Sequence, residues 1–132
     1  MFKKSKLSKQ ALVNKLDAVF SKYIRAKDAK NGVVKCVTCR KYLNSNEAHA
    51  GHYIGRRHMA TRFDEKNVHV QCVFCNTFNE GAKDEYSLYL VNAYGPGILE
   101  ELNRKKHMIA KFETFQLELM ITEYKKKLSE LE

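Results

Sequence analysis

Four cysteines arranged in two pairs constrain this chain more than any other feature. Cys36 and Cys39 enclose two residues, as do Cys72 and Cys75, and a long stretch separates the pairs. Two such pairs are typical of a tetrahedral four-sulfur zinc site whose coordination positions are all filled by protein. The sequence therefore predicts a structural Zn²⁺ that links two distant segments and leaves no position on the metal for a catalytic water.

The charge balance indicates a polyanionic partner. Lysine and arginine number 24 against 15 acidic residues among 132, a formal net charge of +9. The surplus lies in residues 1–66, whereas acidic side chains slightly outnumber basic ones in residues 67–132. We therefore expect a nucleic-acid-binding face in the N-terminal half. The alternative is a basic protein with no such partner.

The apolar content gives no sign of a membrane protein. No segment has the length of a transmembrane helix, and no signal peptide is visible. We therefore expect a cytoplasmic location and no membrane partner. In a reducing compartment, paired cysteines are metal ligands rather than disulfides.

Hydrophobic periodicity predicts a mostly helical α+β chain that forms a single domain over residues 1–132. We expect a basic N-terminal helix within residues 1–30, a zinc-bound core over 31–81 and C-terminal helices over 82–132. The first helix is predicted at 7–29, followed by strands at 33–35, 47–54 and 67–71 and an irregular loop at 56–66. Further helices are predicted from residue 76 to about 81, at 84–94, at 98–106 and at 114–131. The apolar stripes of the C-terminal helices are expected to form core or a homodimer surface.

One histidine and three nearby arginines are of particular interest among the basic residues between the cysteine pairs. Hydrolysis of a phosphodiester needs a base that deprotonates water and a cation that stabilises the developing charge. A neutral imidazole, with an ordinary pKa of about 6.5, suits the first task, and guanidinium groups bind phosphates through paired hydrogen bonds. The residues that we select for these tasks are His52, Arg56, Arg57 and Arg62.

A longer pattern of residues surrounds this histidine. It consists of Gly51-His52, Arg56-Arg57, Thr61-Arg62-Phe63-Asp64-Glu65, Asn67-Val68-His69, Gln71-Cys72 and Cys75-Asn76. The combination resembles the phage NinG family, also called Rap, and the resemblance covers about residues 7–131. It implies a structure-specific DNA endonuclease that cuts branched recombination intermediates, including Holliday junctions and D-loops, in the cytoplasm of a bacterial host cell. The centre is also similar to HNH nucleases with four cysteine ligands, whose ββα, treble-clef-like core is pinned by zinc.

The resemblance implies roles for individual residues. His52 would act as the general base, and Asn67 would hold the loop between the strands. Asn76 would ligate a catalytic Mg²⁺ or Mn²⁺. The residues expected to contact DNA are Arg56, Arg57, Arg62 and His69.

The chain departs from the HNH pattern at one position. Many of these nucleases place an acidic metal ligand immediately before the base, where this chain has Gly51. Asn76 with water and substrate phosphate is one way to hold the metal. His49, His69 and Asp64 are the other candidates, and the sequence does not choose among them.

Other functions are compatible with parts of the pattern. A non-catalytic four-cysteine zinc finger that binds DNA or RNA would explain the cysteines and the charge, with Asn67 as a turn residue and Asn76 as a helix cap. An interaction protein would use the acidic C-terminal helices but would leave the central pattern unexplained. Cleavage that depends on a divalent metal separates the nuclease from both alternatives.

Overall fold

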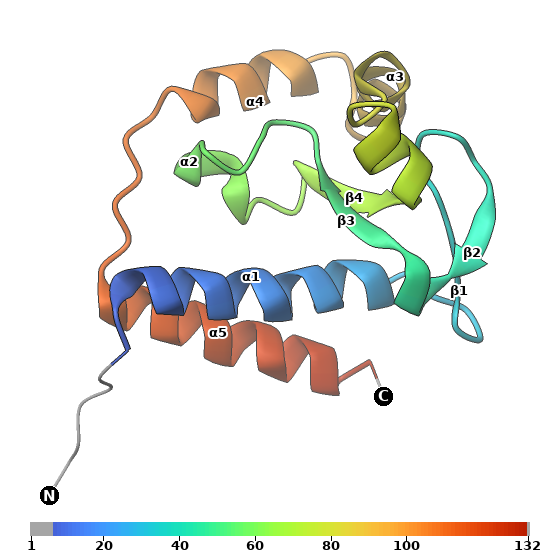
Figure 1. Ribbon diagram of the computed structural model, residues 1–132. Helices are drawn as coiled ribbons and strands as arrows, with labels where there is room; N and C mark the ends of the chain where they lie inside the picture. Colours follow the sequence, from blue (N-terminus) through green and yellow to red (C-terminus); the bar gives the residue numbers. More distant parts are fainter. Residues whose placement is uncertain (1–6, 132) are drawn as a thin grey trace, which may run out of the picture.

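The computed structural model of the protein describes residues 7–131. Its elements in chain order are α1 (Lys9–Ala26), β1 (Val33–Lys35), β2 (Tyr42–Asn44), η1 (Ser45–Glu47), β3 (His49–His52), α2 (Met59–Arg62), β4 (Val68–Gln71), η2 (Phe74–Phe78), α3 (Lys83–Tyr94), α4 (Ile98–Lys106) and α5 (Thr114–Ser129). In Figure 1, α1 and α5 form one layer, β3 and β4 lie in the middle, and α3 and α4 lie on the opposite side. The expected mixture of helices and small sheets is confirmed.

The first layer joins the two ends of the described chain. The helix α1 begins at Ser8, whose side chain accepts a hydrogen bond from the Ala11 backbone N–H at 3.1 Å. Its apolar stripe packs against α5, where Phe20 and Tyr124 meet edge to face with ring centroids 5.0 Å apart. The buried residues of this contact are Leu12, Leu16, Phe20, Ile24, Leu117, Ile121 and Tyr124. The stripe of the last helix therefore contributes to the core of this chain.

A hairpin carries the first cysteine pair. Asn31 and Gly32 have φ values of 53° and 76°, the left-handed conformation that a two-residue turn requires. The flanking Lys30 and Val33 exchange two backbone hydrogen bonds of 3.0 Å, and β1 then pairs antiparallel with β2. The sequence prediction missed β2, because its three residues are too short to show a period of their own.

The middle layer is the antiparallel pair β3 and β4. Gly51 lies opposite His69 in this ladder. The strand β3 is shorter than predicted, because residues 45–47 form the turn η1 and the chain leaves the sheet after His52. All residues of β4 are buried, with Val68 and Val70 in the cluster formed with α1.

The third layer consists of α3 and α4 and covers the other side of the β3–β4 sheet. Tyr86, Leu90, Ile98 and Leu102 form a second buried cluster between α3 and α4. Gly95, at φ 99°, ends α3 while its N–H bonds to the Val91 carbonyl at 2.8 Å. None of the described helices is long and apolar enough to cross a membrane.

Two local elements differ from the sequence prediction. The loop predicted to be irregular at 56–66 contains the short helix α2. The short helix predicted from Asn76 to about residue 81 begins two residues earlier, at Phe74, and is a π-helix, η2. A single π turn widens the backbone where the second cysteine pair and Asn76 lie close together, and π turns of this kind are common at functional sites.

Candidate metal centre and active-site groove

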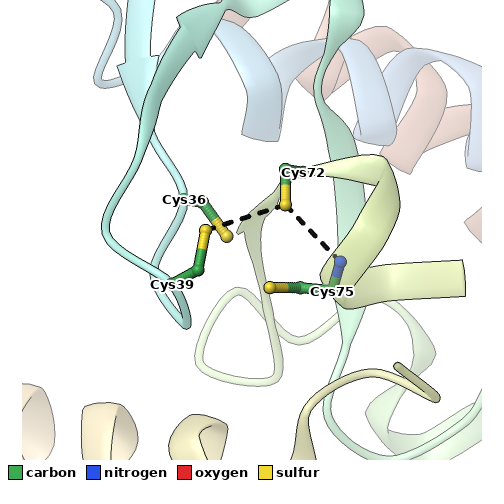
Figure 2. Close-up of side chains that lie close together, drawn as sticks. All are labelled: Cys36, Cys39, Cys72 and Cys75. Atoms are coloured by element: carbon green, nitrogen blue, oxygen red, sulfur yellow. Dashed lines mark hydrogen bonds between the residues drawn. The ribbon is translucent and has the colours of Figure 1, made fainter. Parts of the chain in front are cut away.

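The four cysteines converge from two separate segments (Figure 2). Cys36 and Cys39 lie at the tip of the β1–β2 hairpin, Cys72 follows β4, and Cys75 lies in η2. Their sulfur atoms all lie within 4.8 Å of one another, and the sulfurs of Cys39 and Cys72 are 3.8 Å apart. A tetrahedron with Zn–S bonds of about 2.3 Å has edges of about 3.8 Å. The four cysteines are therefore positioned to bind a metal ion, and their geometry and chemistry fit structural zinc.

A threonine and a glutamine support this cluster from behind. The Thr38 Oγ1 lies 3.3 Å from the Cys36 sulfur and accepts a hydrogen bond from the Gln71 side-chain amide at 3.2 Å. Gln71 also donates to the Gly81 carbonyl at 2.8 Å. Because a metal-bound thiolate carries no proton, the Thr38 hydroxyl is the donor to Cys36. The sequence analysis assigned this supporting role to neither residue, although each lies inside or beside a cysteine pair.

The same contacts change the pKa of the Cys36 thiol. Burial raises its pKa, but hydrogen bonds from the Thr38 side chain and from nearby backbone N–H groups more than offset burial and lower the pKa to about 6. A sulfur that accepts several hydrogen bonds is favoured as thiolate, which is the form that ligates zinc.

A groove of about 610 Å³ lies between α1 and the β3 strand. His49, His52 and Asn76 line it from the central core, and Asp17, Arg25 and Arg56 line it from α1 and the loop after β3. The structure therefore brings the predicted base and the predicted ligand of the catalytic metal to one groove. The predicted DNA-binding residue Arg56 is exposed on its edge.

The ring of His52 is held in one orientation. Its Nε2 lies 2.9 Å from the backbone carbonyl of Arg62, and because a carbonyl can only accept, the ring donates. In the neutral imidazole the lone pair then lies on Nδ1. Burial lowers the pKa of His52, and the positive charge of Arg56 lowers it further, although the Arg62 carbonyl and Asp17 oppose both effects. The net lowering of the pKa favours the neutral form of the ring.

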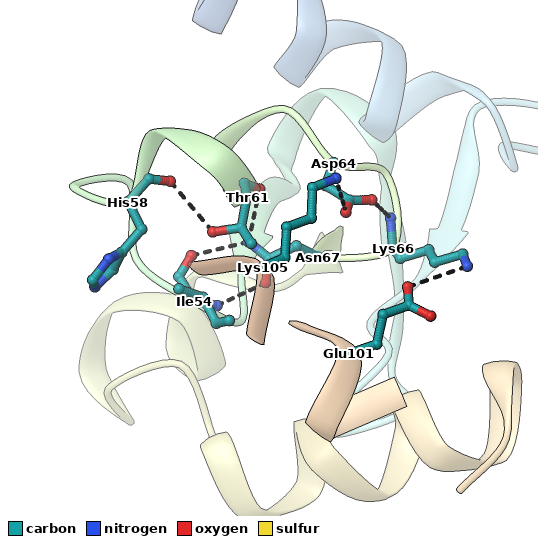
Figure 3. A network of polar contacts seen from close by, with 8 residues as sticks. All are labelled: Ile54, His58, Thr61, Asp64, Lys66, Asn67, Glu101 and Lys105. Carbon is teal, nitrogen blue, oxygen red and sulfur yellow. Dashed lines mark hydrogen bonds and ion pairs between the residues drawn. The ribbon is translucent and has the colours of Figure 1, made fainter. Parts of the chain in front are cut away.

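The structure shows where the candidates for the second ligand of the catalytic metal lie relative to Asn76. The His49 Nδ1 lies 3.0 Å from the Asn76 side-chain nitrogen, and both residues line the groove with His52. Asp64 instead binds the Lys105 ammonium at 2.7 Å (Figure 3). His69 is buried on the far side of the sheet. Of these candidates, His49 is the one that lies beside Asn76.

Asn67 anchors the loop that follows His52. Its side-chain oxygen accepts from the Ile54 N–H at 2.9 Å, and its nitrogen donates to the carbonyls of Ile54 at 3.0 Å and Thr61 at 3.1 Å (Figure 3). Asn67 is fully buried and does not line the groove. Through these hydrogen bonds Asn67 joins Ile54 and Thr61 at the two ends of the loop.

Two of the predicted DNA contacts need correction. His69 is only 5% exposed, and its ring bonds to the hydroxyls of Tyr86 at 3.1 Å and Tyr94 at 2.7 Å. Contacts with Tyr86 and Tyr94 of α3 cover almost all of its ring, so little of it could reach DNA. Arg62 forms a two-pronged ion pair with Asp17, with the Nε–Oδ1 bond at 3.0 Å, and joins α1 to the loop instead of facing solvent. Of the three arginines predicted to contact DNA, Arg56 and Arg57 are exposed.

The sequence profile of the family described as Bacteriophage Lambda NinG protein matches residues 2–132. The chain belongs to the NinG family. It is 32% identical over 114 residues to protein ninG of Salmonella phage P22 and 31% identical over 114 residues to protein ninG of Escherichia phage lambda. Each match covers 83% of this chain and 52% of the relative. Protein ninG of Escherichia phage 933W is 36% identical over 90 residues, which cover 64% of this chain and 42% of the relative.

This NinG-family chain thus spans about half the length of the curated relatives that it matches. No solved structure matches it. The matched range spans the four cysteines and the positions that line the groove. The expected membership of the NinG family is confirmed.

Proposed function

We propose that this NinG-family protein is a divalent-metal-dependent DNA endonuclease of the HNH type. Its substrates would be branched recombination intermediates such as Holliday junctions and D-loops. The observation that carries the proposal is the meeting of His52 and Asn76 in one groove beside a closed four-cysteine cluster. A metal held by four sulfurs supports structure and leaves the chemistry to the neighbouring groove.

The hydrogen bond of His52 indicates which of its two ring nitrogens would act as the base. The Arg62 carbonyl holds the Nε2 proton, so the Nδ1 lone pair is the site that accepts a proton from an attacking water. Arg25 and Arg56 on the groove wall supply positive charge for the phosphate oxygens. The pair Arg62–Asp17 fixes the loop that carries the carbonyl and so fixes the ring.

The second metal would be Mg²⁺ or Mn²⁺, held by Asn76 and His49. The amide oxygen of Asn76 suits Mg²⁺, whereas the imidazole nitrogen of His49 would allow the site to bind Mn²⁺ as well. When bound, the ion would stabilise negative charge on the phosphate and on the leaving oxygen. The hydrogen bond between His49 and Asn76 keeps the two side chains together on the groove.

The test is cleavage of a fluorescent synthetic four-way junction with added Mg²⁺ or Mn²⁺. We expect His52→Ala to lower the rate by roughly 10²- to 10⁴-fold, the usual contribution of a general base. The matched control is His107→Ala, because His107 is exposed and does not line the groove. Unchanged cleavage by His52→Ala would remove His52 from the mechanism.

One alternative has an observation in its favour. Gly51 supplies no acid before the base, which suits a non-catalytic four-cysteine zinc finger that binds nucleic acid through its basic face. Such a protein would bind the junction and leave it intact whatever divalent metal is added. The same assay, run with each metal, separates the two functions.

Homodimerisation through the C-terminal helices stays a prediction. The buried face of α5 packs on α1, so a dimer would have to use exposed residues such as Phe115 and Leu119. Light scattering of the purified protein at several concentrations gives the mass directly. A monomer at every concentration would contradict the dimer.

A further inference from the structure

A second groove opens on the other side of the loop that follows His52. It has a volume of about 510 Å³ and lies between residues 53–58, the start of α3 and the outer face of α4. Three cations line it, Arg57, Lys83 and Lys106, together with the side chain of Asn103. Within the described part of the chain, none of the residues that line it is acidic. The groove is therefore a concave surface of one charge sign.

The two grooves share a wall. Gly55 lines both of them, and the loop that contains it separates one from the other. Lys83 donates from its ammonium to the backbone carbonyl of His52 at 2.9 Å and to that of Tyr53. Asn67 holds the next residue of the loop, Ile54, through two hydrogen bonds. A ligand in the second groove would thus lie at a defined position relative to His52.

The lining indicates what kind of ligand fits. Guanidinium and ammonium groups bind phosphate oxygens, and an amide such as that of Asn103 can donate to phosphate or sugar oxygens. A volume of about 510 Å³ exceeds that of one phosphate and suits a short stretch of sugar–phosphate backbone. Ile54 and Leu99 add some apolar lining, but the cations and polar side chains predominate, which suits a phosphate backbone better than an apolar peptide or a lipid chain.

We propose that this second groove binds the sugar–phosphate backbone of a second arm of branched DNA, while the first groove holds the strand to be cut. This inference rests on the proposed function in one respect only, namely that the ligand is DNA. A branched molecule offers two backbones that diverge from one point, and the two grooves adjoin at the loop that contains Gly55. A short linear duplex can fill one groove without filling the other.

The test measures binding, so it does not depend on cleavage. Fluorescence anisotropy without added Mg²⁺ or Mn²⁺ compares a four-way junction with a short linear duplex. The variant is Arg57→Glu/Lys106→Glu, which leaves Lys83 and its bonds to the loop intact. The control is Lys125→Glu/Lys126→Glu, which makes the same charge change on exposed residues of α5. Zinc content and the thermal midpoint confirm that each variant is folded.

We expect the groove variant to weaken junction binding by at least roughly tenfold and to reduce the salt dependence of binding by about two phosphate contacts. Linear duplex binding should weaken much less, and the α5 control should change neither. An unchanged junction affinity would overturn the proposal, as would an equal loss for the two DNAs or for the two variants. Failure of the nuclease proposal looks different, because junction cleavage would then be absent while this difference in binding persists.

Discussion

Gln71 fills the space in which a side chain at position 51 would lie. A Cβ added to Gly51 would overlap the Gln71 side-chain oxygen and would lie 2.6 Å from its Cδ and 2.9 Å from its Cγ. Gln71 is fully buried, and its amide nitrogen is held by Thr38 and Gly81. The acidic ligand that many HNH nucleases carry before the base therefore has no room here. Position 51 faces the support of the cysteine cluster instead of the groove.

Gly51→Ala should therefore destabilise the protein. We expect a loss of about 1–3 kcal/mol in the free energy of unfolding, because overpacking forces the strand or Gln71 to move. Urea unfolding of the zinc-loaded protein measures it. Gly55→Ala is the control, because nothing lies within 4 Å of a Cβ there and its φ is not left-handed. Equal stability of the two variants would contradict the packing argument.

Thr38→Val should weaken zinc binding while it preserves the shape of the side chain. The variant removes the hydroxyl that donates to Cys36 and accepts from Gln71. Loss of a hydrogen bond to a metal ligand typically lowers metal affinity by about 10- to 100-fold. Competition with a chromogenic chelator gives the affinity. Thr122→Val, on an exposed face of α5, should bind zinc as the parent does.

The pH profile of cleavage should report the lowered pKa of His52. In the proposed mechanism His52 works as a base when deprotonated, so a pKa below the usual 6.5 would keep cleavage active to lower pH than an ordinary histidine would. Because the charge of Arg56 contributes to the lowering, Arg56→Gln should move the acid limb of the kcat profile to higher pH. An acid limb that does not move would contradict the coupling between these two residues.

Buried His69 should make stability fall in mild acid. Burial lowers the pKa of His69 to about 4, whereas the unfolded chain has the ordinary value of 6.5. The unfolded state therefore binds the proton first, and stability present above pH 6.5 is lost as the pH falls toward 4. The full effect is about 3 kcal/mol. Comparing unfolding of the parent with that of His69→Gln isolates it, because acid-driven release of zinc affects both proteins.

Local spacing was enough to find the metal centre. The CxxC pairs predict a four-sulfur cluster because two residues between cysteines already direct both sulfurs to one point, and the structure confirms the cluster. The helices at 84–94, 98–106 and 114–131 were also predicted within two residues of their bounds, because their apolar stripes and the Gly95-Pro96-Gly97 break are local signals. Family membership followed from the residues between the cysteines.

Only the tertiary structure shows which side chains are buried and which charged side chains are paired. His69 and His52 look alike in sequence, but α3 covers the first while the second lines a groove. Arg62 looks like a phosphate ligand until Asp17, 45 positions away, is seen to neutralise it. Gly51 looks like a missing ligand until Gln71 is found in its space. Ligand spacing and helix period are properties of neighbouring residues, whereas exposure and charge pairing are decided by segments that meet only when the chain folds.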